Sequence, residues 1–136
     1  SYNAGWSGYR EEIKKIVIEE GITSIGDYAF YGCTLLENVD IPKSVNKIGA
    51  YSFENTGLLT SIELSNVVTI GSNAFKSSGI TSVTIPTSVM TIGSKAFGLC
   101  LSLTSVTYPL STSGFSSINE NTLDAPAKAI TIELTC

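Results

Sequence analysis

The sequence contains no histidine, and this absence excludes most of the chemistry that a small enzyme uses. Histidine is the usual general base, the partner of serine and cysteine nucleophiles and the commonest metal ligand. The chain also has no C-x-x-C pair, no G-x-S-x-G motif, no P-loop and no dinucleotide-binding fingerprint. The sequence therefore predicts no enzyme activity, with no catalytic residues, no metal site and no cofactor.

Charge is also scarce, because only 15% of the residues are Asp, Glu, Lys or Arg, against about 25% in ordinary soluble domains. The net charge is −4, and the pair Lys14 and Lys15 does not amount to a basic patch. Nucleic-acid binding is therefore not expected. No apolar run reaches the 18 residues of a membrane span, so membrane insertion is not expected. No signal peptide is visible, and a first residue other than methionine is typical of a mature form or a fragment.

What the sequence does contain is a repeat. The hexapeptide Ile-Gly-x-x-(Ala/Ser)-Phe occurs four times, at intervals of 23, 22 and 22 residues, ending at Phe30, Phe53, Phe75 and Phe97. A period of 20 to 29 residues fits one strand plus a short return and is too short for a helix pair. The repeat therefore predicts a solenoid.

The remainder of each unit agrees with this prediction. Alternating apolar residues predict strands that begin near Ile16, Val39, Ile62, Val83 and Val106, with a sixth over residues 129–134. Proline, which cannot donate to a ladder, ends three of them. Six coils spaced about 4.8 Å apart form a rod about 25–30 Å long. The repeated glycines predict backbone positions that a side chain would obstruct, namely Gly26, Gly49, Gly71 and Gly93.

The units L-x-x-V-x-I-P-x-S-V-x-x-I-G-x-x-A-F resemble the BspA-like leucine-rich repeats of bacterial and protozoan surface proteins, over about residues 13–110. The chain start resembles the N-terminal cap of that family, with Trp6, Tyr9 and Arg10. The resemblance implies an α/β-type repeat solenoid, a short right-handed stack of about six coils with a parallel β-sheet on its concave, ligand-binding face. One domain is expected over residues 1–136: a cap and first coil (1–25), the repeats (26–110) and an irregular C-terminal coil or cap (111–136). Trp6 and Tyr9 are expected to cover the edge of the first coil.

Alternate strand residues are expected to face outward together and to form columns across the sheet. One column reads Lys15, Asn38, Ser61, Ser82 and Ser105, and its neighbour reads Val17, Asp40, Glu63, Thr84 and Thr107. All of these residues except Val17 form the predicted binding surface. This surface is charged near the N-terminal coils and carries hydroxyl groups toward the C-terminal coils.

Both parts of this surface have alternative interpretations. Asp40 and Glu63 are expected about 4.8 Å apart, and with Glu37 they favour a basic partner, a divalent cation, or a solvated rim with no ligand. A glycosidase also needs two close carboxylates, but a short smooth solenoid lacks the cleft. The hydroxyl ladder fits purely structural pairing of stacked threonines, a polar surface for protein or glycan, or an ice-binding array interrupted by charged residues.

The three cysteines do not predict a disulfide framework. Cys33 and Cys100 each lie three residues after a repeat phenylalanine, and three coil spacings place them about 14 Å apart, beyond the roughly 7 Å limit for bridged Cα atoms. They are expected to be small buried thiols that fill a turn. Cys136 either bridges to Cys100 across the last coil or remains a free terminal thiol.

Together these features predict a non-catalytic protein-binding and adhesion module. A preordered sheet holds many weak polar contacts in place, so little conformational entropy is lost on binding. By resemblance, the partner is an extracellular or host protein, or else a glycan, and the protein is secreted or on a cell surface. The alternative is a structural spacer or self-assembling segment of a larger surface protein, with stack ends that pair end to end because an open end is an exposed edge.

Overall fold

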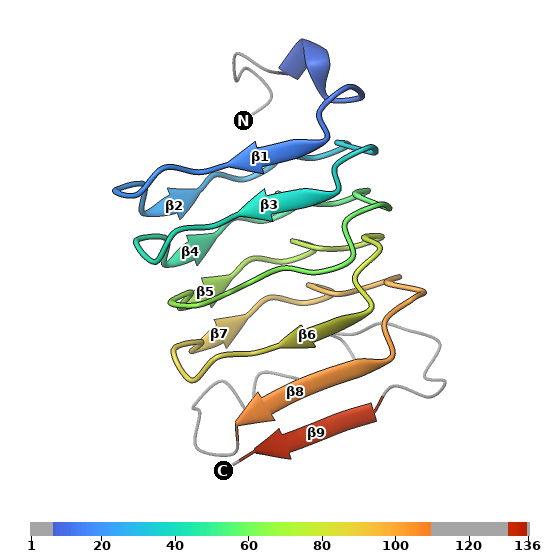
Figure 1. Ribbon diagram of the computed structural model, residues 1–136. Helices are drawn as coiled ribbons and strands as arrows, with labels where there is room; N and C mark the ends of the chain where they lie inside the picture. Colours follow the sequence, from blue (N-terminus) through green and yellow to red (C-terminus); the bar gives the residue numbers. More distant parts are fainter. Residues whose placement is uncertain (1–6, 110–130, 136) are drawn as a thin grey trace.

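The chain folds as a parallel-strand β-solenoid, as the repeat predicts (Figure 1). The computed structural model describes residues 7–109 and 131–135. The 3-10 helix η1 (Ser7–Tyr9) precedes the first coil, and the described ranges contain no α-helix. The return segments of the coils are built from turns and two-residue strands.

Each coil passes through two faces of the solenoid. The front face holds β1 (Lys15–Val17), β3 (Asn38–Asp40), β6 (Ser82–Thr84), β8 (Ser105–Pro109) and β9 (Thr131–Thr135). The back face holds β2 (Ser24–Ile25), β4 (Lys47–Ile48), β5 (Thr69–Ile70) and β7 (Thr91–Ile92). The back strands form one parallel sheet in the order β2-β4-β5-β7, whereas the front strands form two parallel sheets, β1-β3 and β6-β8-β9. The predicted sixth strand is confirmed as β9.

The front face is divided because the third coil lacks the strand predicted at Ile62, so that prediction is wrong. Residues 61–64 still alternate, with Ile62 and Leu64 buried and Ser61 and Glu63 exposed. The coil thus contributes to the core and to the surface without joining either neighbouring ladder. Figure 1 shows the resulting gap between β3 and β6, where the third coil carries no arrow on the front face.

The residue spacing explains the missing strand. Nine residues separate Val39 from Ile48, but only eight separate Ile62 from Ile70. The approach to the next front strand is also one residue shorter, at eight residues from Phe75 to Val83. Ladder bonds need neighbouring strands in matching register, because side chains alternate with a period of two residues. Two single-residue deletions on either side of residues 61–64 therefore displace this segment from the register of both neighbours.

We expect the amide hydrogen of Ile62 to exchange with solvent about tenfold faster, or more, than that of Val83. The two residues are equivalent in consecutive coils, but only Val83 lies in a ladder, and tenfold corresponds to about 1.4 kcal/mol of local opening. Residue-resolved hydrogen–deuterium exchange measures both rates in one sample. Equal protection would show that the third coil is held on the front face as firmly as its neighbours.

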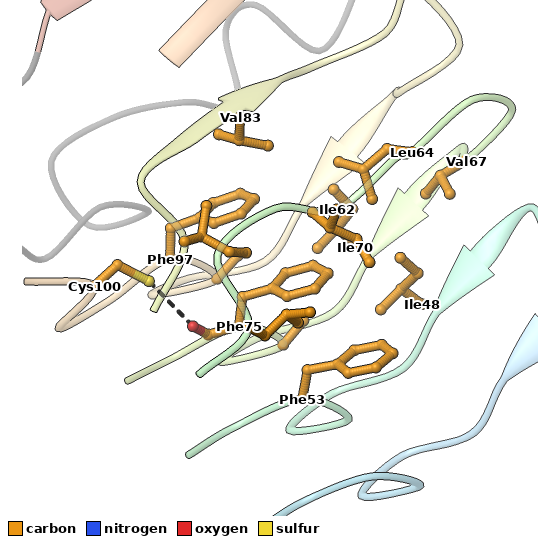
Figure 2. Packing of buried hydrophobic residues seen from close by; sticks show 14 of the residues in the cluster. Ile48, Phe53, Ile62, Leu64, Val67, Ile70, Phe75, Val83, Phe97 and Cys100 are labelled. Carbon is orange, nitrogen blue, oxygen red and sulfur yellow. Dashed lines mark hydrogen bonds between the residues drawn. The ribbon is translucent and has the colours of Figure 1, made fainter. Parts of the chain in front are cut away.

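The core is a set of columns that run through the coils. Phe30, Phe53, Phe75 and Phe97 are buried and stack one above another, with ring centroids 5.4, 5.3 and 5.3 Å apart. Aliphatic columns lie beside this ladder, and Figure 2 shows Ile48 and Ile70 from the back face next to the rings. Each coil buries its apolar residues mainly against the next coil, so the core is continuous although each unit is short.

The repeated glycines are obstructed positions, as predicted, in every coil except the first. A Cβ atom on Gly49 would lie 2.6 Å from the backbone nitrogen of Asp27, and one on Gly71 would lie 2.5 Å from that of Ala50. Gly93 is equally close to Ser72. Gly26 meets nothing within 4 Å. The obstruction comes from the preceding coil, and the prediction is therefore wrong only at Gly26, before which no described coil lies.

The phenylalanine segments connect the coils through alternate backbone N–H groups. Phe30 donates to the carbonyl oxygen of Ser52 in the next coil at 2.8 Å, whereas Tyr31 donates within its own coil to that of Tyr28 at 3.2 Å. This alternation recurs in the following coils and satisfies the buried backbone donors of the turn. It requires left-handed backbone two residues before and after the phenylalanine, at Tyr28, Gly32, Tyr51, Asn55, Asn73, Ser77, Lys95 and Leu99.

Replacing Ser77 by glycine is expected to raise the free energy of unfolding by about 0.5–1 kcal/mol, because a Cβ atom disfavours left-handed backbone. Ser77 has a φ of 58°, and the first coil already carries a glycine, Gly32, at the equivalent position. Ser82→Gly in β6 is the control and should lose about 0.5–1 kcal/mol, since glycine weakens a strand. Urea unfolding of both variants checks the opposite signs. A destabilised Ser77→Gly would mean that the serine side chain contributes more than its backbone costs.

The first coil has a cap formed by Arg10. Its Nη1 donates hydrogen bonds to the carbonyl oxygens of Ala29 at 3.1 Å and Tyr31 at 2.9 Å. The equivalent carbonyls in the next coil, Ser52 and Glu54, accept backbone N–H groups from the coil before them. The guanidinium therefore supplies donors that a preceding coil would have supplied.

The two aromatic residues of the predicted cap differ from Arg10. Tyr9 is 62% exposed, so the expectation that it covers the edge of the first coil is wrong. Trp6 lies outside the described residues.

Candidate functional site

The N-terminal half of the front face carries the charged residues of the predicted surface. The β1–β3 register places Lys15 beside Asn38 and Val17 beside Asp40, which confirms both predicted columns at this point. All four side chains are exposed, while Ile16 and Val39 between them face the core. The alternation of the sequence therefore places these polar groups on the surface.

The C-terminal half carries hydroxyl groups in the same two columns. Ser82 pairs with Ser105 and Thr84 with Thr107. The β8–β9 register adds Thr131 and Glu133 to the columns, two positions absent from the predicted surface. The alternation of residues 129–134 was a sufficient signal for this extension, since the register of the last coil follows from it.

A third hydroxyl column lies beside these two and was missed in the sequence. Thr81 Oγ1 donates to the carbonyl oxygen of Thr60 at 3.5 Å, and Thr104 Oγ1 donates to that of Thr81 at 3.3 Å. These hydroxyl groups bond the backbone of the preceding coil. The geometry supports the structural interpretation for this column, whose constant spacing before the predicted columns was the available signal.

Asp40 and Glu63 are both exposed, but they lie on opposite sides of the division in the front face. No ladder pairs the segment 61–63 with β3 among the described residues. The prediction of directly paired carboxylates is therefore wrong, for the same reason that the strand at Ile62 is missing. Within the described ranges, no three His, Cys, Asp or Glu side chains are grouped so that they could hold a metal ion.

The described cysteines are free thiols in the core, as predicted. Cys33 and Cys100 share their slot with Thr56 and Ser78, and all four side chains are buried. Cys100 Sγ donates to the carbonyl oxygen of Phe75 at 3.1 Å and lies 3.3 Å from Ser78 Oγ (Figure 2). The slot therefore takes small side chains that satisfy the turn. Cys136 lies outside the described residues.

Burial raises the pKa of both thiols above the ordinary value of 9.0, against the opposing effects of Arg10 on Cys33 and of Ser78 on Cys100. We expect neither thiol to react with iodoacetamide in the native protein at pH 8, because the thiolate is the nucleophile. Both should react once the chain is unfolded. Peptide mapping by mass spectrometry identifies the labelled sites, and rapid native labelling of Cys33 would contradict its burial.

The same shifts have a consequence for stability. Because each pKa is higher in the folded state, the neutral thiols contribute stability below pH 9.0, and this contribution is lost as the pH rises above that value.

The fold and its outward columns define a leucine-rich-repeat solenoid, a class whose repeats suggest protein interaction. Residues 8–132 match the BspA-type leucine-rich repeat region in six copies. The chain therefore belongs to the BspA-type leucine-rich repeat family, and the resemblance predicted from the repeats is confirmed. No curated protein shows significant similarity to the chain.

Solved structures support the same fold. A leucine-rich repeat protein from Bacteroides ovatus is similar with a TM-score of 0.78 and 26% identity, over 93% of this chain and 31% of that one. A leucine-rich repeat protein from T. pallidum gives 0.70 and 24%, over 91% and 61% of the two chains. A third, from Eubacterium ventriosum, gives 0.61 and 23%, over 82% and 36%. The present chain thus spans 61% or less of the length of each of these proteins. In the described part of this chain, no helix is both long and apolar enough to span a bilayer.

Proposed function

We propose that the protein is a non-catalytic binding module that engages an extracellular protein through its front face and acts in adhesion, either secreted or at a cell surface. The observation that carries the proposal is the pair of outward polar columns, held in fixed register by β1-β3 and β6-β8-β9. Repeats of this family suggest protein interaction and are generally non-catalytic, and BspA-like proteins are typically secreted or surface-bound.

The rigidity of the display favours this function. Seven of the nine predicted surface residues are exposed, while the strand residues between them are packed on a continuous core. A partner that binds such a face finds its contacts already ordered, so binding loses little conformational entropy on this side. Many weak polar contacts can then add to a useful affinity.

The distribution of charge favours a partner with a basic region opposite the N-terminal half. Asp40 and Glu63 are the acidic members of the predicted surface, and Lys15 is its one cation. The C-terminal half offers hydroxyl groups and suits a neutral protein or glycan surface. Complementary charge sets orientation and association rate more than affinity, and it is screened by salt.

Binding to a panel of purified extracellular matrix proteins, immobilised and measured by interferometry at physiological and raised salt, tests the proposal. A variant that combines Asp40→Lys with Glu63→Lys should bind a positive panel member about tenfold more weakly, which corresponds to about 1.4 kcal/mol. The matched control combines Glu11→Lys with Glu12→Lys. It makes the same change in net charge at exposed positions outside the front face.

Equal loss in both variants would assign the effect to net charge and would remove the front face as the binding site. Full binding by the Asp40 and Glu63 variant would do the same. Absence of binding to every panel member would count against a matrix partner. Exposed substitutions of this kind rarely change stability by more than about 0.5 kcal/mol, so thermal unfolding should confirm that all variants remain folded.

A structural spacer or self-assembling segment is the second candidate. The observation in its favour is that β1 and β9 each have a ladder partner on one side alone among the described residues. Unpaired parallel edges at the two ends can add further coils. Light scattering over a wide concentration range under reducing conditions tests it. A growing, open-ended mass would favour assembly, and a constant monomer mass would favour the binding module.

A further inference from the structure

The first coil bears an apolar groove of about 530 Å³ on the side away from the second coil. Its apolar lining comes from Ile13, Ile16, Ile18, Ile22, Ile25 and Phe30. In every later described coil the equivalent surface is covered by the coil before it, as the short distances at Gly49 and Gly71 show. The groove is therefore the place where one layer of the solenoid core remains to be supplied.

The cap formed by Arg10 indicates which segment supplies this layer. Because Arg10 already satisfies the carbonyl groups of Ala29 and Tyr31, another complete coil could not make its hydrogen bonds at this turn. A second copy of the chain, stacked in the register of the repeat, would compete with the guanidinium there. The occupant must therefore fill the apolar groove and leave the Arg10 bonds in place.

The six residues before η1 meet this requirement. They carry no charged side chain and include two aromatic residues, Tyr2 and the single tryptophan of the chain, Trp6. An aromatic side chain buries about 150–250 Å² of surface. Six extended residues reach about 20 Å, whereas 530 Å³ equals a cube about 8 Å on a side. The segment is thus long enough to cross the groove from a starting point that Arg10 fixes beside it.

We propose that residues 1–6, which lie outside the described range, close the groove within the same chain, with the indole of Trp6 as the apolar anchor. The N-terminal end of the stack is then sealed in two parts, by Arg10 at the phenylalanine turn and by Trp6 over the aliphatic layer. This proposal is independent of the binding function. It opposes end-to-end assembly through the N-terminal end.

The fluorescence of the single tryptophan tests the proposal in the full chain. With excitation selective for indole, the emission should lie at shorter wavelength than that of N-acetyltryptophanamide, and acrylamide should quench it several-fold less. Ile22→Asp places a charge in the groove at a residue that is 48% exposed, and it should shift the emission to longer wavelength and restore quenching. Met90→Asp, at a residue that is 57% exposed and not part of the groove lining, is the control and should change neither.

Three outcomes would overturn the proposal. Emission and quenching of the parent protein equal to those of the free indole compound would place Trp6 in solvent. A protected indole that is insensitive to Ile22→Asp, and to the milder Ile22→Ser if the first variant does not fold, would place it elsewhere. Protection that appears only as the solution mass rises with concentration would show that the groove is filled by another copy.

Discussion

Replacing Phe75 by alanine is expected to lower the free energy of unfolding by about 3–5 kcal/mol, the largest loss among single substitutions in this chain. The ring is fully buried and stacks on Phe53 and Phe97, each at 5.3 Å. Its removal leaves a cavity between two coils that inter-coil backbone bonds hold at a fixed spacing, so the site cannot collapse to fill it.

Urea unfolding followed by circular dichroism measures this loss. Leu58→Ala is the matched control, because Leu58 is an apolar residue of the coil before Phe75 and is 48% exposed. That variant should stay within about 0.5 kcal/mol of the parent protein. A Phe75→Ala loss below about 1.5 kcal/mol would mean that neighbouring coils move together, and that the stack is more compressible than native cores are.

Gly71→Ala is expected to cost about 3 kcal/mol, at the upper end of what added atoms cost in a well-packed core. Its Cβ atom would lie 2.5 Å from the nitrogen and 2.8 Å from the Cα atom of Ala50. These are backbone atoms, which cannot rotate away as the end of a flexible side chain does. The coils must separate locally, which weakens the bond from the Gly71 N–H to the carbonyl oxygen of Ile48 at 2.8 Å.

Gly26→Ala provides the matched control for this prediction, because it is the same substitution in the same hexapeptide. No atom lies within 4 Å of a Cβ at Gly26, so its denaturation midpoint should remain near that of the parent protein. The comparison separates obstruction from the intrinsic difference between glycine and alanine. Equal destabilisation of the two variants would show that backbone entropy, and not the preceding coil, explains why glycine is repeated.

The division of the front face bears on function. It separates the exposed charges of β1 and β3 from the hydroxyl columns of β6, β8 and β9. A partner that spans both halves crosses a coil whose front segment belongs to no ladder. Because unpaired segments open at lower free energy than ladders do, the third coil is the place where the face can adjust to a partner.

The candidate surface was predictable wherever register repeats. The columns at Lys15 and Asn38, and at Ser82 and Ser105, follow from counting residues, because a parallel ladder preserves the position of each alternate side chain. The same counting contains the two deletions that displace residues 61–64. Their effect on pairing was not predictable from alternation alone, since the burial pattern survives there without the ladder.

The sequence by itself determined the solenoid, its period, the core columns and the side chains that face outward. These properties depend on spacing and on side-chain type, which repeat along the chain. Tertiary structure alone decided that Arg10 takes the place of a missing coil, that Tyr9 is exposed and that the front sheet is divided. Each of these depends on which backbone donors and acceptors meet across neighbouring coils. That meeting is a matter of distance and direction in space, which no local pattern encodes.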